Sequence, residues 1–368
     1  MALSPLSEWN NILGITYADN CPYIVPYIIY ESIIIKIFSD KSIFALQMIN
    51  IMASSATCVL LYKIGTHIFG ETSGRLAAWF YLWNPTVLFF ISVLTCQHIA
   101  LFFLLLGIYI IIRQPYRKPV VNLIAAALAE AMSNLFRPEV IVLNIALLCV
   151  AVIYVLKSDL KKLIKSFIGY FIIYMTTLVA INLLLLGGGI VNKSILKSNV
   201  AYKLLVGLNY EHHGTWNEED GIMLLEEDEE IWKLVKERLK DPIKIGELIK
   251  EKIYITYGEY TNYAFFNDWG EEESKTFFQE YILSSMCNGY MLIIIFLAFI
   301  KCLKMKTDMS LQEYIIVISM LGFCLIFTLI ETSNRYSYVI VPFFTLLAGS
   351  AWIDLNRDIV EKNMFDHI

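Results

Sequence analysis

Long runs of apolar residues without a charged side chain recur along the whole chain. A membrane-crossing helix needs about 20 such residues, and sometimes about 17. Runs of this length cover residues 42–62, 76–112, 140–156, 166–192, 281–300, 314–330 and 336–353. The polar sequence at 95–98 divides the second run into two helices, and Pro119–Phe136 supplies a further one. The pattern therefore predicts an all-α integral membrane protein with about nine transmembrane helices.

The composition excludes a water-soluble protein of this size. Of 368 residues, 57% are hydrophobic and only 17% are charged, whereas ordinary soluble domains carry about 25% charged residues. The net charge of −5 gives no reason to expect a nucleic-acid partner, which would favour a basic patch. The 7 cysteines are scattered, mostly in apolar runs and without a metal-ligand spacing, so we interpret them as small core residues.

Short basic loops predict the orientation in the membrane, because Lys and Arg are retained on the cytoplasmic side. They lie at 113–118, 157–165 and 301–306. Counting the crossings between them places residues 95–98, 136–139, 188–283 and 331–335 on the outer face. The carboxyl terminus, with Arg357 and Lys362, is then cytoplasmic. We expect a multi-pass protein of the plasma membrane with its large loop outside.

The amino-terminal segment, residues 1–41, is expected outside by the same count. Its first twenty residues have no basic and apolar pattern of a cleavable signal peptide. Residues 22–38 are apolar but contain Glu31 and Lys36, so we interpret them as an interfacial helix. The alternative is a tenth crossing, which would be short and would carry two charges.

Residues 188–283 form the only large non-membrane region, hereafter the cap. Between Gly189 and Leu283 the chain has 11 basic and 19 acidic residues, a balance of −8. An amphipathic helix is predicted at 226–240 and a second helix at 243–255. Because few apolar residues remain for a core, we expect the cap to rest on the membrane part. The predicted organisation is an outer segment (1–41), six crossings (42–187), the cap (188–283), three crossings (284–353) and a cytoplasmic tail (354–368).

Ionisable groups at the outer ends of the predicted crossings are the candidate functional residues, because polar groups in a membrane protein are costly unless paired or facing a wet cavity. The Arg335 guanidinium matches phosphate oxygens in a bidentate way. Its alternative partner is Glu331, four residues before it. Arg137 and Glu139 flank Pro138, where a structural ion pair and a ligand contact stay equally open. Glu130 lies seven residues before Arg137, nearly on the same helical face.

Other polar groups give weaker signals. Gln97 and His98 offer hydrogen bonds to a ligand, yet a polar turn between two crossings needs such residues anyway. The sequence Glu211-His212-His213 resembles a metal site, but adjacent side chains on an extended loop point in opposite directions. The sequence shows no residue set that requires a cofactor, and nothing in it supports a divalent cation.

Several stretches together resemble the C-type (GT-C) membrane glycosyltransferases. Within that group the chain is most similar to family 39, the bacterial relatives of protein O-mannosyltransferases and of the lipid A aminoarabinose transferase. The likeness rests on weak motifs along nearly the whole chain: residues 22–38, 60–85, 136–139, 207–217 and 331–349, with Phe136-Arg137-Pro138-Glu139 and the Glu-x-x-x-Arg-Tyr pattern from Glu331 to Tyr336.

The resemblance implies transfer of a sugar from a polyprenyl-phosphate carrier to a glycan, lipid or protein acceptor of the bacterial cell envelope on the outer face. The implied substrate-binding residues are Tyr27, Gln97, His98, Arg137, Glu139, Arg335 and Tyr336. The family places an acidic residue, acting as base or orienting the acceptor, after its first crossing. Here the likeness begins at the juxtamembrane helix, so we expect that crossing and acid to precede Met1 unless Asp19 or Glu8 substitutes as the catalytic base.

Two other classes of function stay open. One is a catalytically inactive membrane scaffold or subunit derived from the same family, because the usual acid is not visible. The other is a lipid or sugar transporter, which would also place polar groups in the membrane. Transporters commonly have inverted repeats and interrupted helices at the midplane, and the sequence shows neither.

Overall fold

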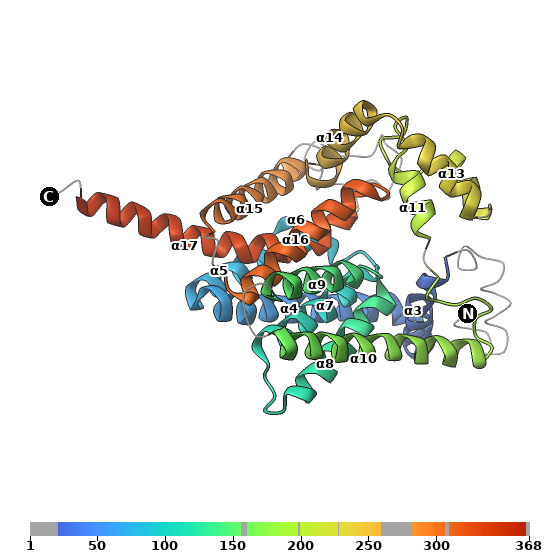
Figure 1. Ribbon diagram of the computed structural model, residues 1–368, viewed down its shortest axis with the longest axis horizontal. Helices are drawn as coiled ribbons and strands as arrows, with labels where there is room; N and C mark the ends of the chain where they lie inside the picture. The colour runs from blue at the N-terminus through green and yellow to red at the C-terminus, as the bar shows by residue number, and fades with distance from the viewer. Residues whose placement is uncertain are drawn as a thin grey trace.

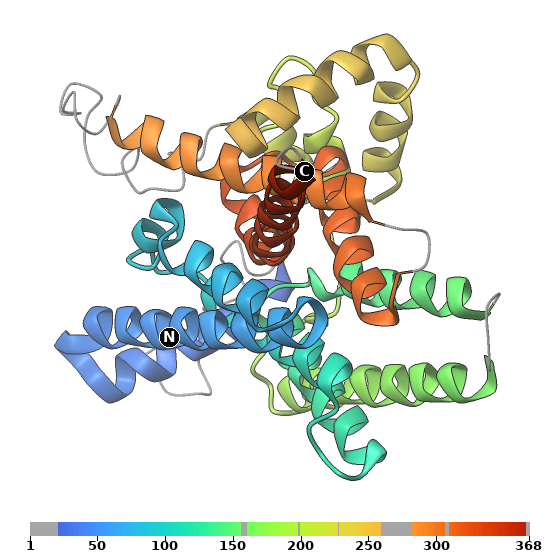
Figure 2. The same cartoon turned by 90° about the vertical axis from the view of Figure 1, so that its left-hand side faces the viewer.

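The computed structural model describes residues 21–155, 160–197, 199–226, 228–258, 282–305 and 309–365. Within these ranges the chain is helical and contains no β-strand (Figures 1 and 2). Long helices pack against one another in the bundle, while shorter helices of the cap lie at one edge of it. The all-α class predicted from the apolar runs is confirmed.

The first half of the bundle begins with a short 3-10 turn, η2 (Pro22–Ile24). The helices that follow are α3 (Val25–Phe38), α4 (Ser42–Phe69), α5 (Glu71–Leu82), α6 (Pro85–Phe90), α7 (Gln97–Arg113), α8 (Pro119–Phe136), α9 (Val140–Val155) and α10 (Leu160–Gly187). Figure 2 shows α3 and α4 as an antiparallel hairpin. The predicted end of the first membrane region at residue 187 coincides with the end of α10.

One predicted transmembrane helix is two shorter helices in the structure. The first part of the apolar run at 76–112 is not one continuous helix, because α5 ends at Leu82 and α6 begins at Pro85. The Asn84 side chain accepts a hydrogen bond from the Thr86 amide at 3.0 Å and caps α6. Proline fits the first helical position, where its missing N–H is not needed. Asn-Pro therefore starts a new helix inside an uncharged run.

The second half consists of the cap and the last helices of the bundle. The cap contains α11 (Val200–Gly207), α12 (Glu218–Ile222), α13 (Asp228–Arg238) and α14 (Pro242–Gly258), and α15 (Ser284–Lys304), α16 (Leu311–Leu329), η8 (Asn334–Val339) and α17 (Val341–Phe365) follow. Both predicted cap helices are present, as α13 and α14. α17 continues without a break past residue 353 to Phe365, so the predicted tail at 354–368 is helical over its described part.

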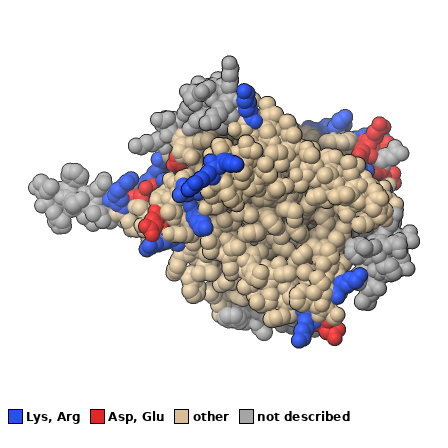
Figure 3. Space-filling model, turned by 90° about the horizontal axis from the view of Figure 1, so that it is seen from below, with Lys and Arg blue, Asp and Glu red and all other residues tan. Residues whose placement is uncertain are grey.

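The surface of the bundle suits a hydrocarbon environment. Among the described residues, five helical segments are long and apolar enough to cross a membrane: Pro22–Phe69, Pro119–Phe136, Ile164–Gly187, Ser284–Lys304 and Leu311–Leu329. Figure 3 shows a broad face with almost no charged side chain, and Lys, Arg, Asp and Glu at its margins. The number of crossings, and whether α3 lies in the interface, stay predictions.

Close helix packing in the centre depends on small residues. A Cβ atom at Gly74 of α5 would lie 2.3 Å from the Thr66 hydroxyl oxygen of α4, and one at Gly349 of α17 would lie 2.7 Å from the Ser73 carbonyl oxygen. Such distances are too short for any real side chain, so α4 and α17 approach α5 at glycine. These contacts give a packing reason for glycine at positions 74 and 349, which lie within the stretches 60–85 and 331–349 of the resemblance.

A buried ion pair holds the cap together. The Arg238 guanidinium donates to Asp220 through Nη2 at 2.8 Å and Nη1 at 3.0 Å, and the Asn209 and Asn217 amides donate to the same carboxylate at 2.8 and 3.0 Å. Burial raises the pKa of Asp220, but these donors lower it by more, so its pKa lies below the usual value. The cap also packs on α16 and η8, so the prediction that it rests on the membrane part is confirmed.

Candidate functional site

The aromatic ring of Tyr336 lies at the centre of a group of charged side chains, hereafter the Tyr336 cluster. The ring belongs to η8, the turn that connects α16 to α17. Its neighbours come from the α8–α9 turn, from α11, from the α16–η8 connection and from η8 itself, and they are Arg137, Glu139, Lys203, Glu331 and Arg335. The fold therefore brings the predicted residues Arg137, Glu139, Arg335 and Tyr336 together.

Arg137 and Glu139 form one ion pair of the cluster. The guanidinium Nη2 lies 2.6 Å from the Glu139 Oε1 atom, and both side chains are mostly buried. The guanidinium also lies over the Tyr336 ring, 5.0 Å from its centroid, a favourable cation–π geometry. Arg137 does not pair with Glu130, because its backbone is extended (φ −150°, ψ 129°) and leaves the helical face of α8. The structural ion pair left open by the sequence is thus present.

Lys203 and Glu331 form the second ion pair, through Lys203 Nζ and Glu331 Oε2. The Tyr336 hydroxyl donates to the same carboxylate oxygen at 3.2 Å. Burial lowers the pKa of the Lys203 ammonium, but the neighbouring Tyr336 and Glu331 oxygens raise it by more, so the side chain stays charged. The pair is supported by the backbone, since the Glu331 amide donates to the Lys203 carbonyl at 2.9 Å.

Arg335 differs from the other cations of the cluster. Its side chain is exposed, and it has no carboxylate partner among the described residues. The guanidinium lies 5.9 Å from the centroid of the Tyr336 ring. The predicted alternative, a pair with Glu331, is not formed, because Glu331 binds Lys203 instead. The guanidinium of Arg335 is therefore available to an anion.

The turn at residues 95–98 supports this arrangement from α7. The buried Gln97 side chain donates through Nε2 to the Arg335 carbonyl oxygen at 2.7 Å. His98 is 1% exposed, with Nδ1 3.1 Å from the Tyr338 hydroxyl and Nε2 3.0 Å from the Phe90 carbonyl oxygen. Both residues position η8, and their direct contact with a substrate stays a prediction.

Helix α3 contributes an aromatic wall against Phe136, the residue before Arg137, and a carboxylate at Glu31. The rings of Tyr27 and Tyr30 lie 6.4 and 5.6 Å from the ring of Phe136 in edge-to-face geometry. Tyr27 and Glu31 form a side-chain hydrogen bond one helical turn apart. Glu31 is partly exposed and has no ion pair among the described residues. The predicted residue Tyr27 thus lies next to the cluster.

Sequence reasoning located part of the site. The candidate bases Asp19 and Glu8 lie outside the described residues, so their role stays a prediction. The sequence did not predict Lys203 as part of the site. This residue is 128 positions from Glu331 in the chain, and no local pattern marks it. Glu31 was not among the predicted site residues either, although its four-residue spacing from Tyr27 places both side chains on one helical face.

A buried lysine fastens the cap close to the cluster. Lys252 of α14 is 1% exposed, and its Nζ donates to the carbonyl oxygens of Gly207 at 2.8 Å and Ile330 at 2.7 Å. Burial without a carboxylate partner lowers the pKa of Lys252 to about 7. Ile330 directly precedes Glu331, so this contact couples α14 to the Tyr336 cluster.

Docking of α14 is expected to strengthen as the pH rises from about 7 to about 10. An undocked lysine has a pKa near 10.4, so in this range the undocked state binds more protons than the docked one, and raising the pH favours docking. Below about pH 7 both states are protonated and the dependence ends. Hydrogen exchange of α14 amides, corrected for intrinsic rates, measures this. Lys252→Met should remove the dependence, and equal pH profiles for the two proteins would contradict it.

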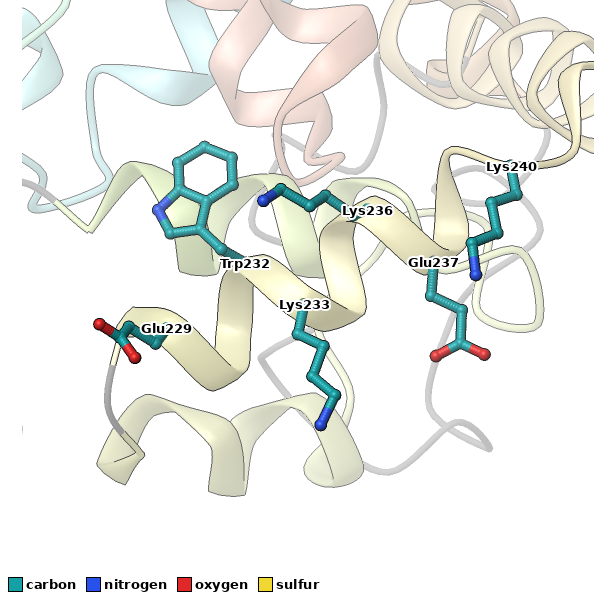
Figure 4. A pocket seen from close by; sticks show the side chains of 6 residues that line it. All are labelled: Glu229, Trp232, Lys233, Lys236, Glu237 and Lys240. Carbon is teal, nitrogen blue, oxygen red and sulfur yellow. The ribbon is translucent and has the colours of Figure 1, made fainter.

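A surface hollow on α13 is a weaker candidate for the site. It is lined by Glu229, Trp232, Lys233, Lys236, Glu237 and Lys240 (Figure 4). All but Lys240, which follows the end of the helix at Arg238, belong to α13, and the charged side chains among them carry both signs. None of them forms a hydrogen bond, ion pair or ring contact with the described residues of the Tyr336 cluster. The described residues also hold no group of three His, Cys, Asp or Glu side chains that could bind a metal ion; His213 pairs with Glu251 instead.

Comparisons with known proteins give one family match and one structural match. A sequence model of the family described as dolichyl-phosphate-mannose-protein mannosyltransferase matches residues 20–185. The fold is similar to that of the archaeal oligosaccharyltransferase AglB from Archaeoglobus fulgidus, in complex with an inhibitory peptide and a dolichol-phosphate, with a TM-score of 0.54, 12% sequence identity and 99% of this chain covered. The match spans 47% of the AglB chain, about half its length. No curated protein sequence matches.

The two matches are consistent with each other. The family match covers the amino-terminal half of the bundle, including Arg137 and Glu139, and the structural match covers nearly all of the chain. At 12% identity the structural likeness shows the fold alone. This multi-pass membrane protein has the GT-C fold, and the resemblance to GT-C membrane glycosyltransferases found in the sequence is confirmed at that level.

Proposed function

We propose that this chain, a membrane protein with the GT-C fold, transfers a sugar from a polyprenyl-phosphate carrier to an acceptor at the outer face of the plasma membrane. The observation that carries the proposal is the exposed guanidinium of Arg335, which has no carboxylate partner among the described residues. A site for a lipid phosphate needs such a cation at the membrane boundary.

The charges of the Tyr336 cluster favour an anionic ligand. Arg137 is neutralised by Glu139, and Lys203 by Glu331, so the cluster of three cations and two carboxylates has one positive charge in excess. A guanidinium binds two phosphate oxygens through parallel N–H groups, which fixes orientation as well as charge. Gln97 holds the Arg335 backbone in place for this contact.

The relatives support the class of donor. The matched family is described by a dolichyl-phosphate-linked mannose, and AglB was solved with a dolichol-phosphate. The family name describes a sugar transferred to protein, and the AglB complex contains an inhibitory peptide, so a peptide or protein is one acceptor class to test, beside the envelope glycans and lipids. An inactive scaffold derived from the same family is the alternative, because the bases predicted from the sequence, Asp19 and Glu8, lie outside the described residues.

The chemistry needs a carboxylate as general base. The acceptor oxygen or nitrogen attacks the anomeric carbon, the bond from that carbon to the phosphate oxygen breaks, and the lipid phosphate leaves with the bonding electrons. The acceptor proton passes to the base. Glu139 and Glu331 are bound to cations, whereas Glu31 is bound only to Tyr27 among the described residues. Glu31 therefore joins Asp19 and Glu8 as a candidate base.

A transfer assay tests the proposal. The purified chain in liposomes should move label from a polyprenyl-phosphate sugar to an acceptor from a panel of peptides, glycans and lipids. Glu31→Gln should lower kcat by about 100-fold or more with little change in the donor KM, because the amide cannot accept the proton. Glu71→Gln, an exposed carboxylate of α5, is the matched control.

The outcomes separate the alternatives. Binding of the lipid phosphate without transfer to any acceptor would favour the inactive scaffold. Movement of the lipid across the bilayer without transfer would favour the transporter. Full activity of Glu31→Gln would exclude Glu31 as the base and leave Asp19 and Glu8 as candidates. The variants Asp19→Asn and Glu8→Gln then distinguish between these two.

A further inference from the structure

A second group of polar side chains lies inside the bundle, with no residue in common with the Tyr336 cluster. It is formed by Glu130 and Asn134 of α8, Asn144 of α9, and Tyr170 and Tyr174 of α10. We refer to it as the inner polar cluster. Glu130 is 0% exposed, and Tyr170, Tyr174 and Asn144 are also buried. The proposed transfer reaction makes no use of these groups.

Glu130 is held without a counter-ion. Neither oxygen of its carboxyl group has a hydrogen-bond partner within the part of the chain that the structure describes, and no described Lys, Arg or His forms an ion pair with it. Its carboxyl group lies against Gly107 of α7, where a Cβ atom would be 2.1 Å from Glu130 Oε1. The carboxyl group therefore occupies the space that a side chain at position 107 would fill.

The other members of the cluster offer acceptors. Glu130 lies within electrostatic range of both Tyr170 and Tyr174, whose rings stack with centroids 6.2 Å apart. The Tyr174 hydroxyl donates to Asn134 Oδ1 at 2.9 Å. The Tyr170 hydroxyl and Asn144 Oδ1 are buried and, like the Glu130 oxygens, have no partner among the described residues.

The cost of burying a charge indicates which ligand the inner polar cluster binds, a proton or a metal cation. An ionised carboxylate without a partner in an apolar interior is far more costly than the neutral acid. The neutral acid carries an O–H group and no net charge, so protonation of Glu130 removes most of this cost. A divalent cation would leave a positive charge in excess, because the cluster contains a single carboxylate.

We propose that the inner polar cluster is a proton-binding site within the membrane part, in which Glu130 holds a proton at neutral pH. The site lies apart from the Tyr336 cluster and does not depend on sugar transfer. Its ligand is a proton taken from water, and the small polar and tyrosine side chains around Glu130 accommodate the acid form.

Infrared difference spectroscopy of the full chain in lipid tests the protonation state. The spectrum of the wild type minus that of Glu130→Gln should contain the C=O stretching band of a protonated carboxylic acid, and this band should shift in D₂O. A carboxylate band in its place at neutral pH would overturn the proposal. Glu313→Gln, which removes a partly exposed carboxylate at the start of α16, is the control and should show the carboxylate band.

A hydrophobic carbodiimide provides an independent measurement. The acid O–H adds across one C=N bond, the carboxyl oxygen bonding to the central carbon and the proton passing to nitrogen, and the adduct rearranges to a stable N-acylurea that peptide mass spectrometry locates. We expect an adduct at Glu130 and its loss in Glu130→Gln. Protection of Glu130 by sodium but not by choline chloride would overturn the assignment to a proton, because the site would then hold a metal cation.

Discussion

Replacement of Arg335 by alanine is expected to reduce kcat/KM for transfer by about 100-fold or more. One charge-assisted donor to a reacting oxyanion is worth about that factor in an enclosed site, and Arg335 is the exposed cation of the Tyr336 cluster that lacks a carboxylate partner among the described residues. The leaving lipid phosphate would lose its bidentate partner. Initial rates with a polyprenyl-phosphate sugar measure the effect.

Two variants make the result specific. Arg335→Lys retains the charge but loses the planar pair of donors, so its activity should lie between those of the wild type and the alanine variant. Arg75→Ala removes an exposed arginine of α5 whose partner is Glu71 at 2.6 Å, and it should leave the rate unchanged. Normal turnover of Arg335→Ala, with the protein intact in the membrane, would remove the phosphate role from this residue.

Gly107→Ala is expected to destabilise the bundle strongly. The new methyl group would lie 2.1 Å from Glu130 Oε1, so the carboxyl group or α7 has to move. Overpacking of this kind costs about 1–3 kcal/mol. Gly169→Ala on α10 is the matched control, because its Cβ would lie 3.5 Å from the nearest atom, a Leu123 methyl carbon. Thermal unfolding in one detergent compares the two variants.

A double variant tests the cause of that loss. Glu130→Ala removes the carboxyl group that collides with the new methyl, so Gly107→Ala combined with Glu130→Ala should be more stable than Gly107→Ala alone. Groups in direct contact typically show coupling free energies of about 0.5–3 kcal/mol. Additive effects of the two substitutions, or equal losses for Gly107→Ala and Gly169→Ala, would contradict the contact.

Most helices could be predicted because the apolar runs and their polar ends are local features. The ends of α8 at Pro119 and Phe136 follow the apolar pattern. The hydropathy pattern did not predict the break between α5 and α6, because hydropathy alone does not detect a helix-capping residue. Asn84 followed by Pro85 is a start signal that could have revealed it.

The partners of the charged residues could not be predicted in the same way. The sequence suggested Glu331 for Arg335 because residues four apart adjoin on an α-helix. The backbone between them is extended at Ser333 (φ −153°, ψ 128°) and then enters a 3-10 helix, so that rule does not apply. Glu331 meets Lys203 of α11 instead.

The sequence by itself determined that the chain is a bundle of membrane helices with Arg137, Glu139, Arg335 and Tyr336 at the ends of helices, because hydropathy and charge are properties of consecutive residues. The tertiary structure alone decided which charge pairs with which, which cation is left for a ligand, and that Glu130 faces Gly107 rather than Arg137. Those outcomes depend on contacts between helices distant in the chain, and no local pattern encodes the desolvation and the distances that set them.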